Sequence, residues 1–182
     1  LITKNYGGVL EGTGQTQPDP VPGVPPLGEF VTEVSGFIEG VKGQVVVGPG
    51  HPAYSPELPP TQDVEQDFCT YNVAISSIIN RLLTPTNQYL EANAPWKLVK
   101  TDKEAAKRVL FNAVQSLRVA SILLKPFIPR SAEAIYTSFN FPKPWGDVTY
   151  ADAAELKAQP DDLRVTAELI DGKVKPLFPR IA

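Results

Sequence analysis

An amphipathic run that ends on a proline and a tryptophan is the feature that most constrains this chain. From about Asp63 to Ala92 apolar side chains recur at a helical spacing: Phe68, Tyr71, Ile75, Ile78, Ile79, Leu82 and Leu83. Pro85 lies inside this run, and it lacks the N–H that a helix needs. The pattern therefore predicts a helix with a kink or break near Thr84, followed by a turn at Ala94-Pro95-Trp96-Lys97.

Three further segments have helical patterns. Apolar residues between Leu27 and Val41 recur every three or four positions, which predicts a short helix. Thr101-Asp102-Lys103-Glu104 has the form of a capping box, with Thr101 as the cap and Glu104 reaching back. The helix that it begins should end at Pro126 and Pro129, with these side chains inward: Val109, Leu110, Ala113, Leu117, Ala120, Ser121 and Leu124. A last helix is expected over residues 131–139, with Ile135, Tyr136 and Phe139 on its buried side.

The segments between and after these helices have the composition of loops and extended chain. Residues 11–28 and 43–62 are rich in Pro and Gly and should be irregular connectors. Asp171-Gly172 between short apolar runs predicts a hairpin. Residues 175–181 should be extended, because a residue that precedes proline avoids the helical region. Together these patterns predict an all-α fold, a small helical bundle with an extended C-terminal arm.

Composition bounds the class of protein. With 182 residues and 42% hydrophobic content, the chain can bury a core of its own. Apolar runs are too short for a membrane span, and no secretory signal pattern is present, so we expect an intracellular protein without a membrane partner. The chain has no Met at all, which favours a fragment of a longer protein.

The sequence offers no recognisable catalytic or metal site. Its lone Cys69 and lone His51 cannot supply a set of soft metal ligands or an internal disulfide. His51 lies in a Pro-rich loop without an orienting partner, and Cys69 falls on an apolar helical pattern, as a small buried side chain does. We therefore expect no catalytic residue, no cofactor and no metal in this chain.

Charge is unevenly distributed, although the net charge is only −3. Residues 1–68 hold nine acidic residues and two basic ones. Residues 97–130 hold two acidic residues and eight basic ones, which are Lys97, Lys100, Lys103, Lys107, Arg108, Arg118, Lys125 and Arg130. A basic block beside an aromatic residue is typical of a surface that binds a phosphate backbone and stacks a base, and a solvated helix face is the alternative.

Several motifs occur in an order that resembles the anticodon-binding domain of methionyl-tRNA synthetases. They are Asn87-Gln88-Tyr89, Ala94-Pro95-Trp96-Lys97, the basic helix, Leu123 to Glu133 with Lys125-Pro126-Phe127-Ile128-Pro129, and Pro176-Leu177-Phe178-Pro179-Arg180-Ile181. Residues 1–10 also resemble the end of the first bundle helix in that family. Each motif alone is modest, and their order and spacing make the resemblance specific.

The resemblance implies a class I synthetase helical bundle that reads the CAU anticodon of a tRNA. Trp96 would stack on the first anticodon base, with Pro95 shaping the turn and Asn87 also contacting the anticodon. Lys97, Lys100 and Arg108 are the expected phosphate-binding residues, which position RNA without reading its sequence. The parent enzyme ligates L-methionine to its tRNA using ATP, and both small molecules would bind a catalytic domain whose signatures this chain lacks.

Some features depart from the family pattern. The family has an acid at the place of Ala92, and its Asn-and-Arg pair that contacts the anticodon would lie upstream of Leu1. The Pro-rich residues 43–62 resemble an insertion. Trp96 could instead be a packing residue of its turn, as we expect for Trp145, and Tyr89 has the helical spacing of a core residue.

These observations define an organisation and a rival function. Residues 1–139 should form the bundle, and residues 140–182 an extension that packs on the bundle or on the catalytic domain. The compartment implied is the cytoplasm, with an organellar matrix as the alternative. The rival function is a non-catalytic, synthetase-derived helical module that acts as a structural or protein-interaction subunit.

Overall fold

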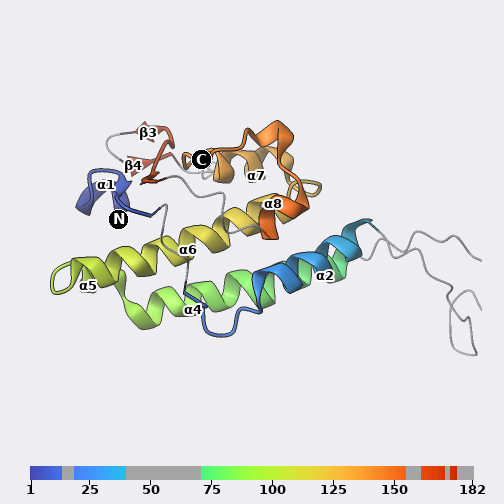
Figure 1. Ribbon diagram of the computed structural model, residues 1–182, viewed down its shortest axis with the longest axis horizontal. Helices are drawn as coiled ribbons and strands as arrows, with labels where there is room; N and C mark the ends of the chain where they lie inside the picture. Colours follow the sequence, from blue (N-terminus) through green and yellow to red (C-terminus); the bar gives the residue numbers. More distant parts are fainter. Residues whose placement is uncertain (14–18, 40–70, 155–160, 171–172, 176–182) are drawn as a thin grey trace, which may run out of the picture.

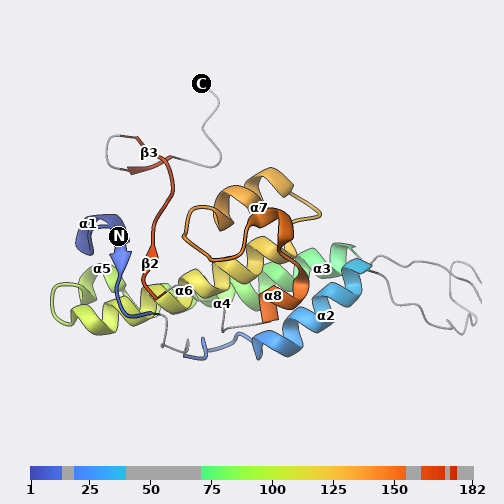
Figure 2. The ribbon, with the colours of Figure 1, turned by 45° about the horizontal axis from the view of Figure 1, so that its top comes forward.

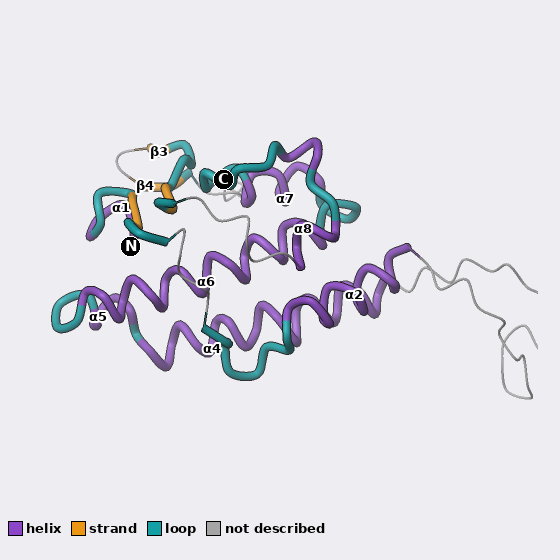
Figure 3. The backbone as a smooth tube through the Cα atoms, in the orientation of Figure 1, coloured by secondary structure: helices purple, strands orange, loops and turns teal. Residues whose placement is uncertain are grey.

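The chain folds around one long central helix. A computed structural model describes residues 1–13, 19–39, 71–154, 161–170 and 173–175. Helix α6 (Lys103–Leu123) runs between two layers (Figure 1): α2 (Leu27–Glu39) and α4 (Thr84–Asn93) lie on one side, and α1 (Ile2–Asn5) and α7 (Pro129–Tyr136) lie on the other. Figure 3 shows that helix dominates the described residues, so the all-α prediction is confirmed.

Helix α6 is buried on nearly all sides, which the sequence pattern did not predict. One apolar cluster joins it to the layer of α2 and to the segment after α7, through residues such as Phe30, Val34 and Val119. A second cluster joins its first half to the N-terminal segment through Ile2, Leu10 and Phe111. Leu117, predicted to point inward, is one of the exposed large apolar residues instead. A helix covered from two sides has no single inward face, so spacing alone misplaces such a residue.

The described segment before Trp96, residues 71–93, is helical, but it changes its winding. Helix α3 (Tyr71–Ser77) passes into a π-helical segment, η1 (Ile78–Leu83), which leads into α4. Of the two predicted alternatives near Thr84, a kink or a break, the break is therefore wrong. The Thr84 N–H bonds to the Ile79 carbonyl, five residues back, and Pro85 is the second residue of α4, directly after this π-helical segment.

Helix α6 begins one residue later than its capping box predicted. Asp102 is the N-cap, and its carboxylate accepts a 2.9 Å hydrogen bond from the Ala105 N–H. Thr101 instead donates from its hydroxyl to the Leu98 carbonyl at 3.3 Å, and Glu104 pairs with Lys107 at 2.6 Å. A carboxylate serves better than a hydroxyl at the positive end of a helix, which explains the shifted start.

The other predicted helices are present with small changes in their bounds. Helix α2 covers the described part of the 27–41 prediction and buries Phe30, Val31, Val34 and Ile38. Helix α7 begins at Pro129, two residues before its predicted start, because proline is well suited to the first helical turn. Its buried side carries Ala132 and Tyr136, while Ile135 is half-buried.

Short strands occur near the N-terminal segment. Strand β1 (Val9–Leu10) pairs with β2 (Leu163–Arg164) in antiparallel register, and β3 (Leu169–Ile170) pairs with β4 (Lys173–Val174). The second pair confirms the predicted hairpin. The predictions for His51, Cys69, residues 43–62 and residues 176–181 lie outside the described residues. In the described part of the chain no helix combines the length and apolar character needed to cross a bilayer.

The chain after α7 returns to the central helix. A 3-10 turn, η2 (Trp145–Asp147), and helix α8 (Tyr150–Ala154) follow α7, and Val148 and Ala153 are buried in the cluster that contains Val119. Figure 2 shows α8 close to α2 and α6, in agreement with the contacts between these helices. Residues 141–154 thus cover the end of α6 that lies away from Trp96.

Candidate nucleic-acid interface

The turn between α4 and α5 (Pro95–Leu98) presents Trp96 to solvent. Ala94 ends α4 in a left-handed conformation, with φ 39° and ψ 60°, and its carbonyl accepts the N–H groups of Lys97 and Leu98 that begin α5. Pro95 is buried at the first position of α5. The chain therefore turns sharply on Ala94 and Pro95, and the next side chain, Trp96, remains 48% exposed. Pro95 shapes this turn and offers no surface for RNA.

Two exposed cations, Lys97 and Lys100, lie on this turn and just after it. Lys97 lies beside Trp96 on α5, and Lys100 follows on the tight turn that leads into α6, with both residues exposed. Backbone hydrogen bonds fix this turn, among them Val99 N–H to the Pro95 carbonyl at 3.0 Å and Asp102 N–H to the Leu98 carbonyl at 2.8 Å. Trp96 and Lys97 thus lie on α5 and Lys100 on the turn that follows it, and Figure 1 shows α5 at one end of the described structure.

Asn87 and Arg108 are placed differently from these three residues. Asn87 is exposed on α4, almost two helical turns before Asn93, and its side-chain amide donates to Glu91 Oε1 at 3.0 Å. Arg108 lies on the second turn of α6, and its Nε is 3.7 Å from the carboxylate of Asp19. A phosphate at Arg108 would have to compete with this carboxylate.

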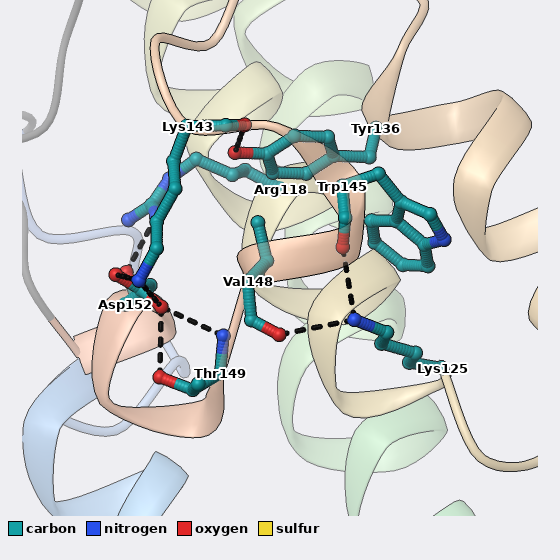
Figure 4. A network of polar contacts seen from close by, with 8 residues as sticks. All are labelled: Arg118, Lys125, Tyr136, Lys143, Trp145, Val148, Thr149 and Asp152. Atoms are coloured by element: carbon teal, nitrogen blue, oxygen red, sulfur yellow. Dashed lines mark hydrogen bonds and ion pairs between the residues drawn. The ribbon is translucent and has the colours of Figure 1, made fainter.

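Two members of the basic block, Arg118 and Lys125, make hydrogen bonds within the fold. Arg118 is only 2% exposed, and its guanidinium donates to the carbonyl oxygens of Asp152 at 2.7 Å and Ala153 at 3.5 Å and to Gln115 Oε1 at 3.2 Å. Lys125 donates to the carbonyls of Trp145 at 2.9 Å and Val148 at 3.1 Å. Figure 4 shows both cations reaching into the segment after α7. The block of +6 therefore does not form one continuous binding surface.

Trp145 is used in the way that was expected for a packing residue. Its ring lies 5.3 Å from the Tyr136 ring, and the Lys125 ammonium lies 4.8 Å from its centroid. It is partly buried against the larger apolar cluster. The chain's two tryptophans thus differ in environment: Trp145 is enclosed by neighbours, and Trp96 projects from a turn.

A polar link behind the turn was missed from the sequence. Asn112 is buried in α6, donates to the Tyr89 hydroxyl at 3.1 Å and accepts the Asp19 N–H at 3.1 Å. Tyr89 is half-buried, as its helical spacing suggested. The signal for this link was a polar residue, Asn112, within the apolar centre of a helix, and it ties α4, α6 and the first connector together.

Tyr6 is a second residue near the turn that the sequence did not single out. Its hydroxyl donates to the carbonyl oxygen of Lys103 at 2.7 Å, although the two residues are 97 positions apart. Burial, with the nearby carboxylates of Glu104 and Asp102, raises the pKa of Tyr6 above its ordinary value. No local pattern marks such a contact, because it depends on where the N-terminal segment folds.

Comparisons with known proteins show which family the chain resembles. A family model described as the anticodon binding domain of methionyl tRNA ligase matches residues 74–169, more than half of the chain. The methionine–tRNA ligase of Pyrobaculum arsenaticum is 30% identical over 163 residues, covering 85% of this chain. That of Sulfurisphaera tokodaii is 48% identical over 66 residues, 36% of the chain. The chain spans 26% of the length of the first relative and 12% of the second.

Proposed function

Because this chain belongs to the family of anticodon-binding domains of methionyl-tRNA ligases, we propose that it recognises the CAU anticodon of a tRNA as part of such an enzyme. The observation that carries the proposal is Trp96, an indole left 48% exposed on a turn that buried Pro95 holds in place. The complete enzyme would ligate L-methionine to that tRNA using ATP, in the cytoplasm. Methionine and ATP would bind a catalytic domain that this chain does not include.

Trp96 would act as a stacking platform. An unpaired base in the anticodon loop presents an apolar face, and an indole offers a large flat partner for it. Such a stack contributes about 1–3 kcal/mol. The turn is already formed by Ala94 and Pro95, so little conformational freedom of the backbone is lost on binding.

Lys97 and Lys100 would hold the phosphates of the loop. Both are exposed next to Trp96, and an ammonium binds phosphate as a point charge without demanding one orientation. Arg108 would contribute only where RNA displaces Asp19, since the two side chains form an ion pair across 3.7 Å. Asn87 would contact the loop only by giving up its bond to Glu91.

The test is the affinity of the protein for an anticodon stem-loop that bears CAU. Trp96→Ala should weaken binding by about 1–3 kcal/mol, or roughly 5- to 150-fold, because the stacked base loses its partner. Tyr71→Ala is a matched control, since Tyr71 is 49% exposed but lies on α3, and it should leave the affinity unchanged. A loop whose first anticodon position is abasic should remove the difference between wild type and Trp96→Ala, because no base is left to stack on the indole.

A salt titration tests the lysine–phosphate contacts, and RNA binding itself separates this function from its rival. Lysine–phosphate contacts release counterions, so affinity should fall steeply as salt rises. Equal affinity of the wild type and Trp96→Ala for the CAU loop would contradict the role of Trp96. A wild type that binds no RNA would favour the non-catalytic, structural or protein-interaction module.

A further inference from the structure

The N-terminal segment places the ring of Tyr6 beside Lys103, the first residue of α6. The Tyr6 hydroxyl donates to the Lys103 carbonyl at 2.7 Å, and the Lys103 ammonium lies 5.1 Å from the centroid of the same ring. Figures 1 and 2 both show α1 beside the turn between α5 and α6. Tyr6 therefore holds the backbone of Lys103 and also offers its side chain a cation–π contact.

Tyr6 can do this because the segment around it is anchored. Ile2 and Leu10, on either side of Tyr6, are buried against Leu110 and Phe111 of α6. Strand β1 also pairs with β2, with Leu10 opposite Leu163. A half-buried ring between two such anchors keeps its position, so Lys103 has a fixed surface to lie on.

Lys103 occupies a position that helix stability does not explain. It is the first residue of α6, where the helix dipole disfavours a cation and favours an acid. The acids there are already engaged, since Asp102 caps the helix at the Ala105 N–H and Glu104 pairs with Lys107 at 2.6 Å. An exposed lysine held here by an aromatic ring suggests a role outside helix formation.

We propose that Lys103 is a further phosphate-binding residue of the RNA interface and that Tyr6 is its positioning residue. This inference rests on the proposed function. Lys97, Lys100 and Lys103 are exposed and follow one another at intervals of three residues around the α5–α6 turn, which its backbone hydrogen bonds fix. Lys103, whose ammonium lies 5.1 Å from the Tyr6 ring centroid, would extend this set of exposed lysines from the α5–α6 turn toward the N-terminal segment.

The first test is removal of the charge by Lys103→Gln. Affinity for the CAU stem-loop should fall about three- to tenfold at low salt, and the slope of log affinity against log salt should decrease by about 0.7, as for one lost phosphate contact. Arg130→Gln removes one charge at the start of α7, which follows the opposite end of α6 from Lys103, and should change neither quantity. Lys103→Arg should keep both near their wild-type values.

The second test concerns Tyr6. Tyr6→Phe keeps the ring and should bind within about twofold of the wild type, whereas Tyr6→Leu removes the cation–π contact and should lower affinity. If Tyr6 acts through Lys103, Tyr6→Leu should add no further loss in the Lys103→Gln background. This lack of additivity is the signature of positioning, and a loss of fold stability alone would not produce it.

The outcomes distinguish this inference from the function on which it rests. If the wild type binds the loop and Trp96→Ala weakens it, but Lys103→Gln changes neither affinity nor salt slope, only the present inference is overturned. If Tyr6→Leu weakens binding equally with and without Lys103, the positioning role of Tyr6 is wrong. If the wild type does not bind, the proposed function and this inference are rejected together.

Discussion

The ammonium group of Lys143 donates hydrogen bonds to both carboxylate oxygens of Asp152, at 2.8 Å to one and 2.7 Å to the other. Asp152 also accepts the N–H and the hydroxyl of Thr149, at 2.7 and 2.8 Å, so one carboxylate closes the turn that begins α8 (Figure 4). Its own backbone carbonyl accepts from Arg118. Asp152 thus joins the segment after α7 to the central helix.

We predict that Asp152→Asn lowers the free energy of unfolding by about 1–2 kcal/mol. The substitution keeps the shape but loses the charge-assisted hydrogen bonds to Lys143 and Thr149. Urea denaturation followed by circular dichroism measures the change. Asp147→Asn, at an exposed acid of the same segment, is the control and should remain within about 0.5 kcal/mol of the wild type.

The same carboxylate should give stability a particular pH dependence. Burial alone would raise the pKa of Asp152, but the hydrogen bonds from Lys143 and Thr149 outweigh it and hold the pKa at about 2, below its ordinary value of 3.8. The contribution of Asp152 is therefore complete above about pH 4 and is lost as the pH falls towards 2. Unfolding curves between pH 5 and pH 2 should fall less steeply for Asp152→Asn than for the wild type. Parallel curves would contradict this prediction.

Arg118→Met should be strongly destabilising. Methionine fills similar space, but the carbonyl of Asp152 and Gln115 Oε1 lose a buried donor, at a cost of about 2–4 kcal/mol. Burial also lowers the pKa of Arg118, which reflects how far this guanidinium is removed from water. Arg130→Met, at an exposed arginine, should change the urea midpoint little. Similar midpoints for the two variants would show that Arg118 is not the structural residue described above.

The helix cap gives a paired prediction. Asp102→Ala should destabilise the fold by about 1 kcal/mol, because the Ala105 N–H loses its acceptor. Thr101→Ala should have an effect below about 0.5 kcal/mol, since its hydroxyl makes only a 3.3 Å bond to Leu98. Thermal unfolding of the two variants side by side checks the assignment. The opposite ranking would restore Thr101 as the cap.

The turn before Trp96 offers a stabilising substitution. Ala94 has a φ of 39°, a left-handed conformation that glycine adopts without strain. Ala94→Gly should therefore raise the free energy of unfolding by about 0.5 kcal/mol, because relief of strain outweighs the greater freedom of glycine in the unfolded chain. Urea denaturation measures the change, with Ala92→Gly inside α4 as a control that should destabilise by about 1 kcal/mol.

Much of the bundle follows from local rules in the sequence. Apolar spacing predicted α2 and most of α6, and Asp171-Gly172 predicted the pairing of β3 with β4. The turn that carries Trp96 was also predicted, since the apolar helical pattern ends near Ala92 and a residue that precedes proline, here Ala94, avoids the helical region. These features depend on interactions between residues that lie within about four positions of one another, and such interactions can be inferred directly from the sequence.

The candidate site was predictable only in part. The sequence determined that Trp96, Lys97 and Lys100 share one turn, because they lie within five residues of one another. Whether each cation of the basic block faces solvent was decided by packing: the segment after α7 buries Arg118 and engages Lys125, and Asp19 pairs with Arg108. Spacing along one helix does not show which other segments will cover it.

Only the tertiary structure brought Tyr6 to Lys103, across 97 positions, and Asn112 to both Tyr89 and Asp19. The π-helical segment that accommodates Pro85 was also beyond the sequence pattern, because the alternatives, a break or a kink, satisfy the same local rule. The sequence determined where helices and turns could form, since backbone geometry and hydrogen bonding act locally. The tertiary structure decided which charges remain in water, since burial depends on segments that are distant along the chain.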